Sequence, residues 1–324
     1  MATLTGRQTA TESPPPLAYH RYIRSATIVA ALAMVGYLGL VAVSDRALLL
    51  DGLGRLHLLQ WLALFGLSLF NYAARFGRWH LYLATLGARV TWQQDLQIYI
   101  AGFALTVSPG KAGEVVRSVY LREKGVPWSQ SLAVLTLERV LDLVAMLMLA
   151  ALALLVFADY AWAALLVVVS AAAGLFAATR PAVIGWLQQQ LPATGRIGTV
   201  ARGTVAILDH ARSLLVPGRL LSGLALGVIA WGAEALGFWL LLDWLGVALE
   251  PWHAMGIYAV GMLAGALSFL PGGVGGAEAA MVALVLAGGA TMSTAVLATV
   301  ICRAVTLWFA VVIGIGSLLS LGRR

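Results

Sequence analysis

Charged residues are scarce in this chain of 324 residues. Asp, Glu, Lys and Arg make up 11% of it, against about 25% in a typical soluble domain. Hydrophobic residues make up 61% and the mean hydropathy is +0.89, which excludes an ordinary water-soluble globular domain. The single cysteine, Cys302, excludes an intrachain disulfide, and the five histidines are scattered without the spacing of metal ligands.

Motifs for catalysis and for nucleotide binding are also missing. The glycine-rich stretch from Pro271 to Gly276 lacks the Gly-Lys-Ser/Thr ending of a phosphate-binding loop, and no Ser-His-Asp set is evident. We therefore expect no enzyme activity and no cofactor. The net charge of +7 lies at the ends of apolar segments, which indicates contact with anionic lipid and not with nucleic acid.

The sequence consists largely of long apolar segments. Several of them exceed the ~18 residues that mark a membrane span. The polar residues 1–20 are expected to form a disordered cytoplasmic tail, and residues 21–324 a single membrane domain. The fold class we predict is an all-α integral membrane protein with about six full spans plus two re-entrant helical hairpins in an inverted repeat. The spans are expected at about 23–43, 58–79, 129–157, 160–179, 220–242 and 293–319.

Two apolar segments, 96–107 and 255–270, are shorter than a span requires. Each ends at a Pro-Gly break, which interrupts a helix because proline lacks an N–H group and glycine is permissive. A short helix is expected after each break, at 113–124 and at 278–286. Such breaks at membrane depth are tolerated where protein or a water-filled cavity covers the backbone, so we predict two re-entrant hairpins.

Charge placement predicts the orientation of the chain. Lys and Arg concentrate on the segments that this threading places inside, whereas Arg46 and Arg55 are left outside. The termini and an amphipathic arm at 181–217 are then cytoplasmic. The two hairpins enter from opposite faces, so the halves 58–179 and 220–320 form an inverted repeat, the arrangement used for alternating access.

Arg75 and Arg78 lie in the last turns of the span predicted at 58–79. Because long basic side chains near a helix end can reach water, we expect both to extend to the membrane interface.

The two halves share a pattern of charge. Glu114 follows the first break and Glu278 the second, and each is followed by an arginine 25 residues later, Arg139 and Arg303. Charges inside apolar segments are costly and usually functional. Two interpretations stay open. The glutamates can cap the short helices and form structural pairs with the arginines, or the arginines can hold a phosphate or carboxylate ligand.

A glycine also recurs between each glutamate and its arginine. Gly125 and Gly289 each lie 11 residues after the glutamate of their half. The repetition favours a duplicated unit.

Two basic residues flank Glu114. Lys111 and Arg117 are expected to form a basic nest at the cytoplasmic mouth that suits an anionic head group, with ordinary interface charge as the alternative.

Three further acids are candidates for proton or ion coupling. Glu138 and Asp142 lie on one helix face beside Arg139, where like charges can share a proton. Glu234 lies in the middle of the span at 220–242, and we expect Arg303 or Arg139 as its partner.

The second half differs from the first at the positions that match Glu138 and Asp142. Cys302 and Thr306 stand there. We therefore expect the first half to carry the chemistry.

Three stretches, 109–117, 137–142 and 270–278, together with Arg303, resemble the lysylphosphatidylglycerol synthase transmembrane family, also called flippase-like domain proteins. The resemblance covers about Trp61 to Leu319. In full-length synthases this domain is fused to a soluble aminoacyl-transferase, which is missing here, so the resemblance implies no aminoacylation. It implies movement of lipid between leaflets.

We therefore expect a lipid flippase or transporter of the bacterial inner membrane that acts on an anionic or aminoacylated lipid. The alternatives are a secondary transporter of a small soluble anion, a component of hopanoid or carrier-lipid export, and a membrane scaffold for a lipid-modifying enzyme. A membrane lipid is the expected partner, with a homo-oligomer or a lipid-modifying enzyme left open. The residues expected to bind the substrate are Lys111, Glu114, Arg117, Arg139, Glu278 and Arg303.

Overall fold

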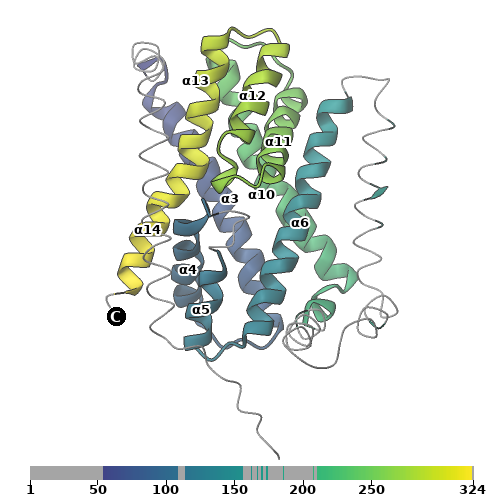
Figure 1. Cartoon of the computed structure of the whole chain (residues 1–324), viewed down its shortest axis with the longest axis vertical. Helices are drawn as coiled ribbons and strands as arrows, with labels where there is room; N and C mark the ends of the chain where they lie inside the picture. Colours follow the sequence, from purple (N-terminus) through teal and green to yellow (C-terminus); the bar gives the residue numbers. More distant parts are fainter. Residues whose placement is uncertain are drawn as a thin grey trace, which may run out of the picture.

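The computed structural model describes residues 54–108, 114–155 and 210–322, together with isolated helical positions between them (Figure 1). The described part is helical throughout and contains no strand, which agrees with the all-α prediction. Several predicted features lie outside the described residues. They are the span predicted at 23–43, most of the span predicted at 160–179, residue Lys111 and most of the arm at 181–217.

Long helices form the frame. The helices α3, α6 and α10 each contain 28 residues, or ~42 Å at the rise of an α-helix. A fourth long helix runs from Met292 to Leu321, and it and α10 are apolar enough to cross a membrane. It is composed of α13, a π-helical turn and α14. The bounds of these elements are α3 Leu58–Thr85, α6 Trp128–Leu155, α10 Pro217–Trp244, α13 Met292–Arg303, the π turn Ala304–Trp308 and α14 Phe309–Leu321.

Two hairpins of short helices complete the described fold. The first contains α4 (Trp92–Ala101), a 3-10 turn (η1, Gly102–Leu105) and α5 (Val116–Glu123). The second contains α11 (Pro251–Leu267), a 3-10 turn (η4, Pro271–Gly273) and α12 (Gly276–Ala287). The second break occurs at its predicted place, whereas the residues of the first predicted break, 109–113, lie outside the described residues.

Gly125 and Gly289 end the returning helices α5 and α12 in the same way. Their φ angles are 83° and 93°, in the left-handed region that glycine adopts without strain. The glycine that recurs in the sequence thus has one structural role in both hairpins.

The hairpins lie at opposite ends of the molecule. In Figure 1 α4 and α5 occupy the lower half and α11 and α12 the upper half. Val107, at the end of the described part of the first hairpin, lies against the second break, because a Cβ added to Gly272 would lie 3.1 Å from its Cγ1. The long helices surround this meeting point, with α6 beside α11, α3 beside α10, and α14 beside α4 and η1.

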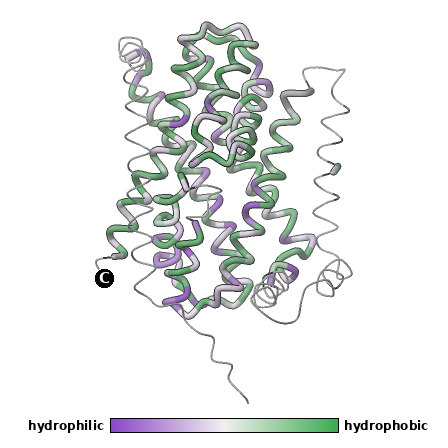
Figure 2. The backbone as a smooth tube through the Cα atoms, in the orientation of Figure 1, coloured by the Kyte–Doolittle hydropathy of each residue, from purple (hydrophilic) through white to green (hydrophobic). Residues whose placement is uncertain are grey.

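Hydrophilic residues are not spread evenly over the described helices. Figure 2 shows them along α3, α5 and α6 in the lower half, whereas the upper hairpin and α14 are mostly hydrophobic. The polar residues thus gather where the first hairpin meets two long helices.

The π turn is a feature that the sequence did not predict. It begins directly after Arg303 in what the sequence presents as one continuous span. The hydroxyl of Tyr72 on α3 donates a hydrogen bond to the backbone carbonyl of Thr306 within the turn. Such turns are rare and are frequent at functional sites.

Packing of α14 against η1 gives a first prediction. A Cβ added to Gly314 would lie 2.3 Å from the backbone N of Ala104 and 2.7 Å from the backbone C of Phe103, whereas Gly316 has nothing within 4 Å. We expect Gly314→Ala to lower the free energy of unfolding by about 1–3 kcal/mol, as overpacking does. Gly316→Ala is the matched control and should leave it unchanged or slightly higher. Thermal unfolding of both variants in detergent measures the difference, and equal melting temperatures would contradict this packing.

Candidate functional site

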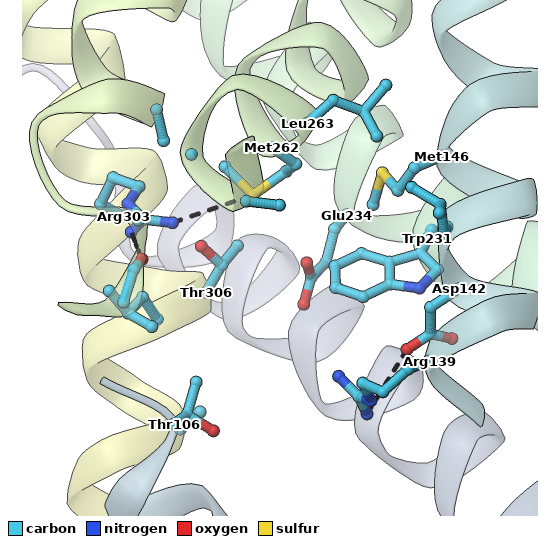
Figure 3. Close-up of a pocket in the computed structure, with 18 of the residues that line it drawn as sticks. Thr106, Arg139, Asp142, Met146, Trp231, Glu234, Met262, Leu263, Arg303 and Thr306 are labelled. Atoms are coloured by element: carbon cyan, nitrogen blue, oxygen red, sulfur yellow. Dashed lines mark hydrogen bonds and ion pairs between the residues drawn. The ribbon is translucent and has the colours of Figure 1, made fainter. Parts of the chain in front are cut away.

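A cavity of about 410 Å³ lies where the two hairpins meet. Figure 3 shows Arg303 on one side, Arg139 and Asp142 on the other, and Glu234 between them. The remaining wall is mostly apolar. The charged residues that line the cavity are Arg75, Glu114, Arg139, Asp142, Glu234 and Arg303.

A network of ion pairs forms the lower wall of this cavity. Within the described residues it joins four guanidinium groups to three carboxylates through side chains of α3, α5, α6 and the segment that leads into α5. Its members are Arg75, Arg78, Glu114, Arg117, Glu138, Arg139 and Asp142. Helical spacing explains the gathering, because residues three or four positions apart on α3 and on α6 project from the same face.

Glu138 lies at the centre of the network and is fully buried. Its carboxylate oxygens lie 3.2 Å from Nη1 of Arg117 and 3.4 Å from Nη2 of Arg139. The Nη2 atoms of Arg75 and Arg78 lie 3.5 and 3.8 Å away. The hydroxyl of Tyr99 on α4 also donates to it, at 3.1 Å. One carboxylate therefore connects α3, α4, α5 and α6.

Asp142, one turn further along α6, shares three of these arginines. Its carboxylate lies 3.1 Å from Nη2 of Arg75 and 3.5 Å from Nη2 of Arg139, and it accepts a hydrogen bond from Arg78. Guanidinium groups on this many sides favour the ionised form of a carboxylate. The shared proton that the sequence suggests for Glu138 and Asp142 stays a prediction.

The prediction that Arg75 and Arg78 extend to the membrane interface is wrong. They do not extend to the interface: Arg75 is 5% exposed and Arg78 is fully buried. Arg75 also stacks on the ring of Trp231, with its guanidinium carbon 4.8 Å from the ring centroid. A signal for this burial was present, since Ser68, Tyr72 and Arg75 follow one another at helical spacing and mark a polar face of α3.

Arg117 also lies elsewhere than predicted. It is fully buried and not at an open cytoplasmic mouth. Its guanidinium lies 4.0 Å from the ring centroid of Tyr99 and 5.3 Å from that of Trp79. A Cβ on Gly102 would come within 2.4 Å of its Nε atom, so the fit depends on that glycine. Arg117 supports the network from behind the cavity wall.

The duplicated spacing brings each glutamate to its arginine. In the first half, Oε2 of Glu114 lies 3.2 Å from Nη2 of Arg139. In the second half, Nε of Arg303 donates to Oε1 of Glu278 at 2.8 Å. Both pairs are therefore present.

The second pair also holds the break in its hairpin. Nη2 of Arg303 donates to the carbonyl of Gly272 at 2.7 Å, and Glu278 accepts from the backbone N–H of Gly275 at 2.6 Å. At the positions that match Glu138 and Asp142, the hydroxyl of Thr306 donates to the carbonyl of Cys302. Within the part of the chain that the structure describes, the first half thus carries an extended network and the second a single Glu–Arg pair.

Glu234 on α10 has a partner that the sequence did not indicate. It is 5% exposed and accepts a hydrogen bond from the hydroxyl of Tyr258 on α11. The two arginines expected as partners, Arg139 and Arg303, line the same cavity.

The residues predicted to bind a substrate thus occupy three kinds of position. Glu114, Arg139 and Arg303 line the cavity. Arg117 and Glu278 lie behind it, each bonded to a partner described above. Lys111 falls outside the described residues. Within the described part, no group of three metal-ligating side chains comes together.

One rim of the cavity is apolar and exposed. Leu143 on α6 and Phe269 and Leu270 beside the second break line the cavity, yet they are 50%, 76% and 48% exposed. Phe269 also has a φ of 54°, a conformation that costs energy for a bulky residue. Among the described residues, the cavity is therefore open to the side, between α6 and the second hairpin.

Removing the central carboxylate gives a second prediction. Glu138→Gln would leave four guanidinium groups with less opposing charge, so we expect a loss of about 3–5 kcal/mol in the free energy of unfolding. Glu123→Gln, at an exposed position of α5, is the control and should melt as the wild type does. Thermal unfolding in detergent is the measurement. A Glu138→Gln variant as stable as the control would show that the network is not structural.

Comparison with known proteins supports the resemblance seen in the motifs. A search of curated protein sequences returns no match to this chain. Residues 27–314, most of the chain, match the sequence model of the lysylphosphatidylglycerol synthase TM region. The chain therefore belongs to the lysylphosphatidylglycerol synthase TM-region family and is a membrane protein.

Proposed function

We propose that this protein moves an anionic, polar-headed lipid between the two leaflets of the bacterial inner membrane. The head group would occupy the cavity while the acyl chains remain in the bilayer. The observation that carries this proposal is the combination of a charged wall with an exposed apolar rim on the same cavity. A lipid is a ligand that needs both surfaces at once.

The opposed hairpins supply a route for the head group. In our proposal the first hairpin enters from the cytoplasm and the second from the periplasm, as an inverted repeat. Val107 of the first hairpin lies against Gly272 of the second, and in our proposal the cavity beside them lies between the two membrane faces. Rocking of one half against the other would then open the cavity to each leaflet in turn.

Arg139 is the residue that we propose to contact the head-group phosphate. Its side chain is 26% exposed, whereas the side chains of the other six network members are at most 8% exposed. A guanidinium offers a planar pair of N–H donors that fits a phosphate. Glu114, Glu138 and Asp142 surround Arg139, and in our proposal a phosphate would take over part of their role.

Arg303 would face the phosphate from the second hairpin. Its bonds to Glu278 and Gly272 keep it in place, so we propose that it adds positive potential without leaving its partners. The two arginines of the repeat then contribute differently to the same ligand.

The alternatives are less compatible with the geometry. A transporter of a small soluble anion has no need of an exposed apolar rim such as Leu143 and Phe269. A scaffold for another enzyme would leave its polar residues wholly buried and paired, whereas Arg139 reaches the cavity.

Replacement of Arg139 tests the head-group contact. We expect Arg139→Ala to slow lipid flipping about tenfold or more, because a charge-assisted hydrogen bond contributes ~1.5–3 kcal/mol and ~1.4 kcal/mol is a factor of ten. Arg122→Ala removes an exposed arginine of α5 and serves as the control. The rate is measured in proteoliposomes that contain fluorescently labelled phosphatidylglycerol, by chemical quenching of the outer leaflet. Equal rates for both folded variants would rule out the contact.

Narrowing the rim tests whether the substrate is a lipid. We expect Leu143→Trp to slow flipping several-fold, since the larger side chain would stand in the opening through which acyl chains extend. Leu221→Trp, on an exposed face of α10 away from the cavity, should flip lipid at the wild-type rate. The same quenching assay applies. If the Leu143 variant kept full activity, the chains would have to leave the cavity by another path.

A further inference from the structure

The charges around the cavity are balanced. Within the described residues, the ion-pair network, the Glu278–Arg303 pair and Glu234 together contain five arginines and five acids. They are Arg75, Arg78, Arg117, Arg139 and Arg303, against Glu114, Glu138, Asp142, Glu234 and Glu278. With every acid ionised the sum is zero. An anionic head group would add one negative charge in a region of low dielectric, where unbalanced charge is costly.

A proton taken up by one of the five acids would restore the balance. Glu114, Glu138, Asp142 and Glu278 each lie within 4 Å of a guanidinium group. A guanidinium only donates hydrogen bonds, so it favours a carboxylate and gives a protonated carboxyl no acceptor. These four acids are therefore unsuited to gaining a proton.

The hydrogen bond between Glu234 and Tyr258 can form with the Glu234 carboxyl group either ionised or protonated. The phenol hydroxyl donates to the ionised carboxylate, as the structure shows. After protonation the carboxyl O–H can donate to the phenol oxygen instead, because a hydroxyl is both donor and acceptor. Glu234 can thus change charge without losing this partner.

The position of Glu234 gives it access to the ligand. It lines the head-group cavity, and its carboxylate lies between Thr306 and Trp231 in Figure 3. It also borders a small adjoining void beside Ser68 and Cys302. The titratable and charged groups around it come from four helices. They are Tyr72 and Arg75 on α3, Arg139 and Asp142 on α6, Tyr258 on α11, and Cys302 and Arg303 on α13.

We propose that each anionic head group is bound together with one proton, which Glu234 carries. This inference rests on the proposed function. On the side where the lipid enters, the Glu234 carboxylate takes up a proton from the aqueous phase. On the other side the lipid leaves and the proton returns to water. One monoanionic lipid and one proton then cross together, and no net charge moves.

A pH gradient across proteoliposomes tests this coupling. With labelled phosphatidylglycerol and the membrane potential held at zero, one-to-one coupling predicts a leaflet ratio that shifts about tenfold per pH unit, since ~1.4 kcal/mol is a factor of ten. Lipid should accumulate in the leaflet that faces the more alkaline side. Glu234→Gln can neither gain nor lose a proton, so its leaflet ratio should not depend on the pH gradient. Glu123→Gln, at an exposed site, should behave as the wild type does.

The outcomes separate the two proposals. No flipping by the folded wild type would overturn the proposed function. Flipping that ignores the pH gradient would overturn the coupling and leave the function standing. A Glu234→Gln variant that follows the gradient as the wild type does would overturn the assignment to Glu234.

A second measurement uses the wild-type protein alone. Short-chain phosphatidylglycerol is added to the wild-type protein in weakly buffered detergent, and a pH-sensitive dye reports proton uptake. We expect about one proton for each lipid bound, the ratio that linkage between the two ligands requires. Binding without proton uptake would overturn the coupling.

Discussion

The ion pairs of Glu138 are the interaction on which the rest of the structure depends. Buried charges are tolerated only when they are paired and hydrogen-bonded, and here one carboxylate is approached by four arginines from three segments of the chain. The relative positions of α3, α5 and α6 are fixed by this requirement. Because Arg139 lies at the edge of the network, the same interaction gives the cavity a cationic wall.

The two hairpins share a plan but differ in their chemistry. In each, a glutamate beside the break pairs with an arginine of the following long helix. The first pair is part of an extended network, whereas Arg303 binds Glu278 and the break itself. The π turn directly after Arg303 and its bond from Tyr72 add a local irregularity to the second half. A polar wall and an opposing, internally stabilised hairpin therefore enclose one cavity.

Much of this arrangement could be predicted from the sequence. The breaks, the recurring glycines and the 25-residue spacing are local patterns, and they predicted the short helices and both ion pairs. The burial of Arg75 and Arg117 depends on helices far away in the chain, including the ring of Trp231 and the absence of a side chain at Gly102. The π turn has no residue signature. Tertiary contacts of this kind are not encoded in any single segment.

The most direct test of the account is a structure of the protein in a lipid bilayer with phosphatidylglycerol bound, determined by electron cryo-microscopy. The account predicts head-group density beside the Arg139 guanidinium, with acyl chains that leave the cavity between Leu143 and Phe269. A cavity filled by water alone, with the lipid bound only on the outer surface of the helices, would contradict it.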